Sequence, residues 1–509
     1  MSPSVLPSPE PPASAADIAR QVAAGRVLAA DVLAASLRLH EEWASRLNGL
    51  VQLRRREAEA EATAIDDTIA KRASGAGPLA GVPVSVKECF AVRGLATTLG
   101  ILSRRGLVDG EDAEIVRRVR AAGAVVIGKA NVPQAMYLHE TDNPVWGLTR
   151  HPLDATRGPG GSSGGDAALV AAGVVPLGIG NDLAGSLRQP ANACGIAAIM
   201  PRTAALGEGG GFDTLPGLQA VRPRAGFLAR TVDDLGLAIA AIGAACPAAV
   251  VPSKPRRVAW WDDTGPIPPS PAVSRAVHEA VARLESHGLE VVRVAGDIAT
   301  EAAWLLLGIV AADGGDDVRR LFAGSRPTKG VGKLLAIARL PRRWRPFVAA
   351  VLRLTGNRSE AEGVLRTGRR TPAERAGLIA ARDTLATRFS AAVTGCDAVV
   401  CPVSAVPALR QGSAARLVLA AAPCLLANLF DLPAGAVPVT TVRTDEERHR
   451  PWSLDPVLRA AAATDRGSAG LPVGVQVVGC PGRDEATVLH VMRLIEAGRE
   501  RPTRSCGPR

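Results

Sequence analysis

Residues 158–191 read GPGGSSGGDAALVAAGVVPLGIGNDLAGSLRQPA and contain a loop, a helix, a strand and a sharp turn in succession. The glycine- and serine-rich loop covers residues 158–165, and the small apolar residues of DAALVAAG after it predict a helix. VVPLGIG predicts a buried strand, because it is a short apolar run bounded by turn residues. This order of elements is typical of an α/β architecture.

The same alternation continues on both sides of this stretch. Further strand, helix, strand runs are GPLAGVPVSVK (77–87), EDAEIVRRVRAAG (111–123) and AVVIGKANV (124–132), then RRVAWW (256–261), AVSRAVHEAVARLESHG (272–288) and LEVVRV (289–294). No linker rich in proline or serine separates them. We therefore expect an α/β fold: a single large α/β/α domain with a twisted mixed central sheet covered by helices on both faces.

The boundaries within the chain follow from composition and periodicity. Apolar residues recur at helical spacing from Ser14 to Ile69, which predicts two or three opening helices, and a long helical stretch is expected at about 301–390. The expected parts are a disordered tail at 1–13, the main domain at 14–498 with N-terminal helices at 14–75 and a helical cap-like insertion at 318–372, and a basic tail at 499–509.

Composition excludes several classes of function. The net charge of +11 comes from arginines interleaved with acidic residues, which indicates a solvated surface. There is no aromatic pattern for stacking bases and no zinc-finger spacing, so no nucleic-acid partner is expected. The eight cysteines are scattered without a CxxC pair, which favours a reducing, cytoplasmic compartment and argues against structural zinc.

The glycine-rich loop matches other motifs only in part. Residues 161–165 satisfy GxSxG, which would make Ser163 the nucleophile, but that turn must follow a strand and RGPG is not one. A phosphate loop would end in Gly-Lys-Ser/Thr, and Gly178-Ile179-Gly180 lacks the third glycine of a dinucleotide loop. We expect no nucleotide, no metal and no other cofactor.

The turn at residues 180–191 offers a serine at the end of a strand. Ser186 lies among small residues whose backbone N–H groups could form an oxyanion hole beside a nucleophile. A tight turn that only connects two elements would explain the same residues. By itself this turn does not decide between the two interpretations.

The combination of three segments is more specific. Lys87 ends the strand VPVSV, Ser162 lies in the loop, and Ser186 follows 24 positions later. This pattern resembles the amidase signature family, in which a lysine after a short apolar strand is followed by GGSSGG and GTDxGGSxRxPA. Further segments that resemble the family, in family order, are GKANVPQAM (128–136), GFLARTVDDLGLAI (226–239), DAVVCPVSAVPA (397–408), NLFDLPAGAVPV (428–439) and GLPVGVQVVG (470–479).

The resemblance implies an amidase that works through an acyl-enzyme intermediate. Ser186 would be the nucleophile, Ser162 the proton shuttle held by a cis Gly161–Ser162 peptide, and Lys87 a base whose pKa burial must lower. The resemblance also implies substrate binding at Met136 and an oxyanion hole from the N–H groups of Leu183, Ala184, Gly185 and Ser186.

Three positions depart from the family pattern. Asn181 stands where the family has threonine or serine, Ala184 where it usually has glycine, and Met200 where it has lysine. If the turn needs a positive φ at residue 184, alanine would be strained there and the oxyanion geometry would differ.

Within the family, residues 85–188 look most like fatty acid amide hydrolases, so hydrophobic or fatty acyl amides are the expected substrates. One alternative is a glutamine amidotransferase-type subunit that makes ammonia for a partner enzyme. Another is a non-catalytic scaffold, which would be expected to lack Ser186 or Lys87. A homodimer is a further expectation for the partners of this chain.

Residues 331–354 predict a pair of amphipathic helices broken at Pro341. The first offers Val331, Leu334, Leu335 and Leu340; the second offers Trp344, Phe347, Val348, Val351 and Leu352 beside Arg342, Arg343, Arg345 and Arg353. An apolar face edged by arginines is typical of a helix at a membrane interface. We expect peripheral membrane contact here, with a helix pair packed on the core or a second subunit as the alternative.

Overall fold

Eleven strands form one sheet in the computed structural model, which describes residues 14–71, 76–242 and 254–498. The expected tails at 1–13 and 499–509 lie outside the described residues. The strands are β1 (Leu50–Leu53), β2 (Pro83–Lys87), β3 (Val125–Ala130), β4 (Leu177–Asp182), β5 (Ala197–Met200), β6 (Arg224–Ala229), β7 (Arg257–Trp260), β8 (Glu290–Arg293), β9 (Ala398–Pro402), β10 (Ala434–Thr441) and β11 (Pro472–Gly479).

The sheet is mixed, as predicted. Its order is β1-β3-β2-β4-β6-β5-β10-β11-β9-β7-β8. β2 runs parallel to β3 and β4, and β7 runs parallel to β8 and β9, whereas the remaining neighbours are antiparallel. All five residues of β2 and all six of β4 are buried, which is why both strands are nearly continuous runs of small and apolar residues.

Eighteen α-helices surround the sheet in the described part of the chain. They are α1 (Ala15–Ala23), α2 (Ala29–Leu47), α3 (Arg55–Ala70), α4 (Glu114–Ala121), α5 (Gly164–Ala172), α6 (Arg188–Cys194), α7 (Thr203–Leu206), α8 (Val232–Ile242), α9 (Pro271–Ser286), α10 (Asp297–Val310), α11 (Asp316–Phe322), α12 (Lys329–Arg339), α13 (Arg345–Leu354), α14 (Arg358–Arg366), α15 (Pro372–Ala392), α16 (Leu425–Leu429), α17 (Pro456–Asp465) and α18 (Glu485–Ala497).

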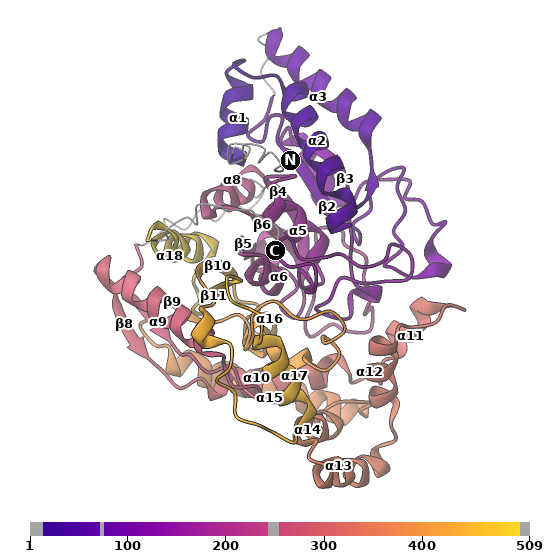
Figure 1. Cartoon of the computed structure of the whole chain (residues 1–509), viewed down its shortest axis with the longest axis vertical. Helices are drawn as coiled ribbons and strands as arrows, with labels where there is room; N and C mark the ends of the chain where they lie inside the picture. The colour runs from indigo at the N-terminus through magenta and orange to yellow at the C-terminus, as the bar shows by residue number, and fades with distance from the viewer. Residues whose placement is uncertain (1–13, 72–75, 243–253, 499–509) are drawn as a thin grey trace, which may run out of the picture.

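The sheet is covered on both faces, as predicted. α8, α9 and α18 pack beside one another and against β6, β10 and β11 (Figure 1). On the other face α5 and α6 pack together, with α5 against β2 and β4 and α6 against β5, β10 and β11. Every residue of α5 is buried, because α2 and α6 cover the side that the sheet does not. Only small side chains fit there, which explains the sequence GGDAALVAA.

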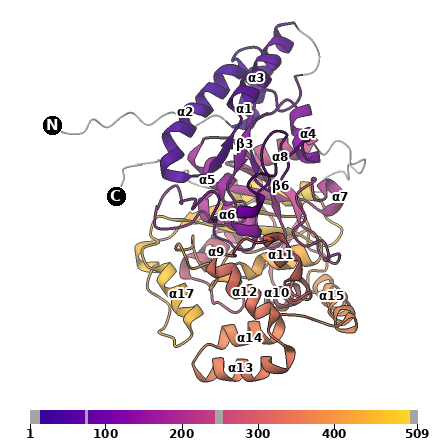
Figure 2. The ribbon, with the colours of Figure 1, turned by 90° about the vertical axis from the view of Figure 1, so that its right-hand side faces the viewer.

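Helices α11 to α14 gather at one end of the molecule, opposite the opening helices α1 to α3 (Figures 1 and 2). The helix pair predicted at 331–354 is present as α12 and α13, and Pro341 lies between them. The predicted apolar faces differ in burial. Val331 and Leu335 of α12 pack inward against the core, whereas Phe347 of α13 is 62% exposed.

The prediction that Arg345 lies at the exposed edge of this helix pair was wrong. Arg345 is buried, and its guanidinium donates hydrogen bonds to backbone carbonyls in the last turns of α12 and α14, including those of Ile337 and Val364. Carbonyls near a helix end have fewer backbone partners, and the planar guanidinium can satisfy several of them at once. Arg345 therefore joins α12, α13 and α14 instead of facing solvent.

Two further features bear on the expectations from composition. The cysteines in the described ranges are free thiols, and all are buried: Cys89, Cys194, Cys396, Cys401, Cys424 and Cys480. Within the same ranges, every helix is too short or too polar to span a bilayer.

Candidate active site

The sheet brings two distant segments together at the carboxyl ends of β2 and β4. These strands are parallel neighbours, with Val86 opposite Ile179, so Lys87 and Asn181 follow at the same edge. Lys87 is fully buried there. The edge lies beside the start of α5, which brings the glycine- and serine-rich loop to the same place.

The ammonium nitrogen of Lys87 faces three oxygen atoms. Its Nζ lies 2.7 Å from Oγ of Ser162, 2.6 Å from Oδ1 of Asn181 and 3.3 Å from the backbone oxygen of Asn181. Burial lowers the pKa of Lys87, although the nearby Cys89, Asp166 and Asp182 act in the opposite direction. A lysine with a lowered pKa can act as a base near neutral pH.

Ser162 lies in a loop whose backbone is held from two sides. The Gly161–Ser162 peptide is cis, as the resemblance implied. The N–H of Gly161 donates to Oε1 of Gln189 at 3.1 Å, and Oγ1 of Thr141 donates to the carbonyl of Gly160 at 2.8 Å. The loop position of Ser162 is thus fixed by side chains from α6 and from the segment after β3.

Ser186 lies in the turn between β4 and α6. Its carbonyl accepts a 3.1 Å hydrogen bond from the N–H of Ser163, which joins this turn to the glycine- and serine-rich loop. Its side chain is the most exposed of the three predicted catalytic residues, with a residue exposure of 9% against 2% for Ser162 and 0% for Lys87. Its hydroxyl forms no hydrogen bond within the described part of the chain.

The four N–H groups predicted to form an oxyanion hole are not equivalent. That of Gly185 already donates to Oδ1 of Asp182 at 2.7 Å. Those of Leu183, Ala184 and Ser186 have no hydrogen-bond acceptor among the described residues. Three donors therefore remain available to a ligand beside Ser186.

An ion pair under the turn holds its shape. Arg188 and Asp182 are both fully buried, and their Nη2 and Oδ1 atoms lie 3.0 Å apart. The carboxylate also accepts from the N–H of Leu187 at 3.1 Å and from Nδ2 of Asn428 at 3.0 Å. Burial alone would raise the pKa of Asp182, but Arg188 and these hydrogen bonds outweigh it and hold the pKa well below its usual range.

The structure accounts for each departure from the family pattern. Ala184 is not among the residues with positive φ; Gly185 is, at φ +96°, and a Cβ there would lie 2.9 Å from Cβ of Cys424. The strain considered for Ala184 is therefore absent. Asn181 contacts Lys87, and Met200 is buried with its sulfur 3.3 Å from Nδ2 of Asn428.

One contact of the turn was missed by sequence reasoning. Nε2 of His139 lies 3.1 Å from the carbonyl oxygen of Ala184. Burial lowers the pKa of His139, so the neutral ring can donate from Nε2 to that carbonyl. His139 lies only three positions after Met136, the predicted substrate contact, but no motif marks it, since its partner is a backbone atom 45 positions away.

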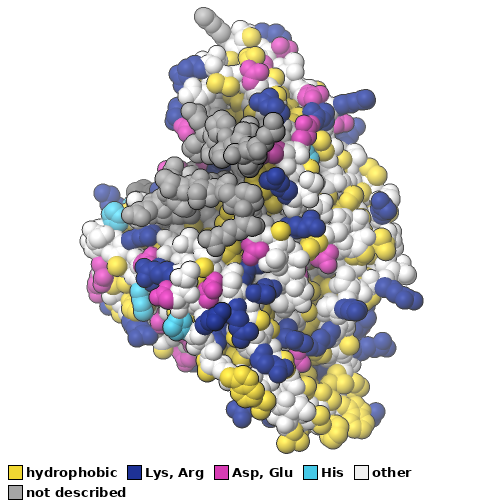
Figure 3. Space-filling model, viewed as in Figure 1, with side chains coloured by type: hydrophobic (Ala, Val, Ile, Leu, Met, Phe, Trp, Pro, Cys, Tyr) yellow, Lys and Arg dark blue, Asp and Glu magenta, His cyan; other side chains and the backbone are white. Residues whose placement is uncertain are grey.

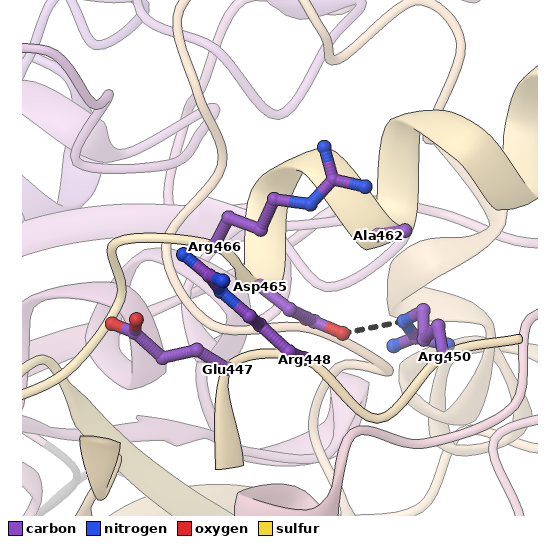
Figure 4. Close-up of a pocket in the computed structure, with 6 residues that line it drawn as sticks. All are labelled: Glu447, Arg448, Arg450, Ala462, Asp465 and Arg466. Carbon is purple, nitrogen blue, oxygen red and sulfur yellow. Dashed lines mark hydrogen bonds and ion pairs between the residues drawn. The ribbon is translucent and has the colours of Figure 1, made fainter. Parts of the chain in front are cut away.

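A separate pocket of about 440 Å³ contains none of these residues. It is lined by Glu447, Arg448, Arg450, Ala462, Asp465 and Arg466 (Figure 4). Asp465 points toward Arg450 and forms a 2.5 Å ion pair with it. No group of three histidine, cysteine or acidic side chains in the described ranges is arranged to hold a metal ion.

The chain is similar to known amidases over most of its length. A family model described as Amidase matches residues 31–488. The chain is 32% identical over 461 residues to fatty-acid amide hydrolase 1 of Sus scrofa, covering 84% of this chain and 78% of that protein. It is also 32% identical over 502 residues to putative amidase AmiB2 of Mycobacterium bovis, covering 96% of each.

The fold has the same relatives. The solved structure of a fatty acid amide hydrolase superposes on this chain with a TM-score of 0.82, covering 96% of this chain and 86% of the other. Sequence identity in that superposition is 22%, so this likeness concerns the fold. The chain therefore shares its overall fold with that solved hydrolase.

Proposed function

The chain belongs to the amidase signature family of hydrolases that cleave amide carbon–nitrogen bonds, and from that premise we propose an acyl-enzyme mechanism through Ser186, Ser162 and Lys87. The observation that carries the proposal is the 2.7 Å contact between Nζ of Lys87 and Oγ of Ser162, beside the turn that holds Ser186. A non-catalytic scaffold does not fit, because the hydrolase family is shown and all three residues are present.

The acylation step can be written with these residues. The neutral amine of Lys87 takes the proton of Ser162 as Ser162 takes that of Ser186, and Oγ of Ser186 attacks the amide carbon. The attack requires the Ser186 hydroxyl to turn toward Ser162. As the carbon–nitrogen bond breaks, the proton held by Lys87 passes back through Ser162 to the leaving amine. Water then hydrolyses the acyl-enzyme by the same route.

The oxyanion formed in this step needs donors that are not already used. We assign this role to the N–H groups of Leu183, Ala184 and Ser186, and a supporting role to that of Gly185, which holds Asp182. Losing one essential donor of this kind costs about 3–4 kcal/mol of transition-state stabilisation. The buried Asp182–Arg188 pair keeps the donors in place before substrate arrives.

Covalent labelling with a fluorophosphonate probe tests the nucleophile. Ser186→Ala should abolish labelling. Ser163→Ala is the matched control, since Ser163 is the neighbouring serine of the GxSxG match, and it should still be labelled. Persistent labelling of Ser186→Ala together with loss in Ser163→Ala would overturn the assignment.

The acyl group that we propose is hydrophobic. Two relatives carry the name fatty-acid amide hydrolase. Residues 85–188 also look most like the fatty acid amide hydrolase branch of the family, which supports the same choice.

A panel of amides tests this choice of acyl group. The purified protein should hydrolyse long-chain acyl amides with a higher kcat/KM than acetamide or benzamide. A kcat/KM that does not change with chain length, or a preference for acetamide, would contradict the proposed hydrophobic acyl group. Glutaminase activity that appears only with a partner protein would instead favour the amidotransferase alternative.

We also propose that the end of the molecule at α13 contacts membranes or lipid-like substrates. Its exposed apolar side chains are Trp344, Phe347, Val351 and Leu354, with Trp452 and Leu454 from a second segment of the chain. Leu454 lies beside Gly356, directly after α13, so the two segments are neighbours. Figure 3 shows hydrophobic side chains gathered at this end. We call these six residues the apolar patch.

The charges around the apolar patch suit an anionic surface. Arg342 and Arg353 lie at either end of α13 and are exposed, although each also forms an ion pair with a glutamate. Arg343 is exposed and has no acidic partner in the described ranges. An apolar surface flanked by arginines is the arrangement that binds at a lipid interface.

A further inference from the structure

Asn181 presents two oxygen atoms to Lys87. The side-chain oxygen lies 2.6 Å from Nζ and the backbone oxygen 3.3 Å from it, while Oγ of Ser162 lies 2.7 Å away. Asn181 is 5% exposed and lies in β4 two residues after Ile179, the last residue of β4 that pairs with β2. The backbone contact depends only on the sheet, but the side-chain contact depends on asparagine at this position.

The number of donors on Lys87 changes during the proposed reaction. A neutral amine has two N–H donors and one lone pair, and an ammonium has three donors and no lone pair. If the two N–H groups of the amine point to the two oxygens of Asn181, its lone pair points to the remaining neighbour, Ser162. After protonation all three donors of the ammonium still have an acceptor.

We propose that Asn181 is a positioning residue, whose side-chain oxygen directs the lone pair of Lys87 toward the hydroxyl of Ser162 and then stabilises the ammonium that forms. This inference rests on the proposed roles of Lys87 and Ser162. It adds a residue that touches the base but neither the substrate nor the nucleophile.

An amide oxygen suits this role better than a hydroxyl. The amide oxygen only accepts hydrogen bonds, so it can bind an N–H of the amine but cannot occupy its lone pair. A serine or threonine hydroxyl at the same place could donate to the lone pair and compete with Ser162. The amide NH₂ of Asn181 forms no hydrogen bond in the described part of the chain, so nothing else competes for its orientation.

Other ionisable groups around Lys87 already have their own partners or stay neutral. Asp182 pairs with Arg188, and Asp166 accepts a 2.7 Å hydrogen bond from Oγ of Ser85 while burial raises its pKa to about 7. Cys89 lies two positions after Lys87, and burial raises the pKa of its thiol to about 12.

Glu88 follows Lys87 in the chain, and its carboxylate accepts hydrogen bonds from the N–H groups of Thr98 and Leu99. A further ionisable group is His139. It donates to the carbonyl of Ala184, and burial lowers its pKa. Among the described residues, the side chains that accept a hydrogen bond from Nζ are those of Ser162 and Asn181.

Two substitutions at residue 181 should move the pH dependence in opposite directions. The measured quantity is the second-order rate constant for labelling by a fluorophosphonate, between pH 5 and pH 10. Asn181→Leu keeps the approximate shape of the side chain but removes the oxygen that accepts from Nζ of Lys87. The plateau of the rate constant should therefore fall by about tenfold to a hundredfold, and the acid limb of the pH–rate profile should move to lower pH. Asn181→Asp places a carboxylate beside the ammonium, so the acid limb should move to higher pH by at least about one pH unit.

The matched control is Asn192→Leu. Asn192 is another buried asparagine, and its Oδ1 accepts from the N–H of Gly474 at 2.7 Å, away from Lys87. This variant loses the same group and should keep the wild-type acid limb. Circular dichroism and the unfolding midpoint of each variant separate a folding defect from a rate defect.

The outcomes distinguish this inference from the proposed function. If both variants at residue 181 keep the wild-type acid limb, or both move it in one direction, Asn181 does not position Lys87. If Asn181→Leu does not fold, Asn181→Asp alone decides through the sign of its shift. Failure of the proposed function would appear instead as labelling that survives in Ser186→Ala.

Discussion

Nζ of Lys87 and Oγ of Ser162 lie 2.7 Å apart, although 75 positions separate the two residues in the chain. Lys87 ends a buried strand, and Ser162 lies in a loop held by Gln189 and Thr141. The contact is therefore fixed by the sheet on one side and by α6 on the other.

The first prediction concerns the base and the shuttle. Lys87→Ala should lower the rate constant for acylation by about 10²–10⁴-fold, the range typical of general base catalysis, and Ser162→Ala should fall between it and the wild type. The double variant should be little worse than Lys87→Ala alone, because the residues act as a unit. Fully additive losses, measured by stopped-flow labelling, would argue against a shared proton path.

The second prediction concerns stability and pH. Burial lowers the pKa of Lys87 below its ordinary value of 10.5. At a pH between the lowered pKa and 10.5, Lys87 is protonated in the unfolded chain but neutral in the folded one, so the unfolded chain binds more protons. The free energy of unfolding should therefore rise with pH in this window, by up to about 1.4 kcal/mol per pH unit.

Lys87→Met removes this contribution. It should be more stable than the wild type at neutral pH, and the difference should shrink as the pH approaches 10.5. Urea unfolding at pH 7, 8 and 9 measures the slopes. Lys71→Met, at an exposed lysine, is the control and should keep the wild-type slope. A Lys87→Met slope equal to that of the wild type would show that Lys87 is not buried as a neutral amine.

The third prediction concerns the ion pair under the turn. Asp182→Asn leaves the guanidinium of Arg188 buried without a counter-charge, so the free energy of unfolding should fall by about 3–5 kcal/mol. Glu362→Gln breaks the exposed ion pair with Arg353 and should change the free energy of unfolding little. Equal effects of the two substitutions in urea unfolding would contradict the structural role of the buried pair.

The fourth prediction concerns metals. The motifs of the sequence contain no ligand cluster, and Lys87 needs no metal to act as a base. Dialysis against EDTA should leave the hydrolysis rate unchanged. If activity is lost and then restored by added zinc or another divalent ion, the reaction needs a metal ion that the proposed mechanism omits.

The fifth prediction concerns the apolar patch. The chain should float with anionic liposomes at low salt, and Trp344→Ala/Phe347→Ala should weaken flotation. High salt should weaken binding by screening the arginines, while the apolar side chains keep a residual affinity. Leu28→Ala is the matched control, since Leu28 is 52% exposed but lies next to α2 at the opposite end (Figure 1). If the wild type does not float at low salt, α13 is an ordinary surface helix and does not bind membranes.

The sequence alone indicated much of the fold and of the candidate site. Strands at VPVSVK and VVPLGIG and the helix DAALVAAG could be predicted because buried parallel strands need continuous apolar runs and a helix against a sheet needs small residues. Lys87, Ser162 and Ser186 were indicated by the resemblance of three local motifs to those of the amidase signature family.

The contacts between those segments were decided only by the tertiary structure. Asn181 could be noted as a departure from the family, but its contact with Lys87 needs the register of β4 against β2. His139 reaches the turn through a backbone carbonyl, which leaves no trace in residue type. Likewise, the periodicity of α12 and α13 predicted two apolar faces, but only packing decided that α12 buries its face and α13 does not. Periodicity and motifs record what each segment requires locally, whereas the neighbour that satisfies it is set by how distant segments pack.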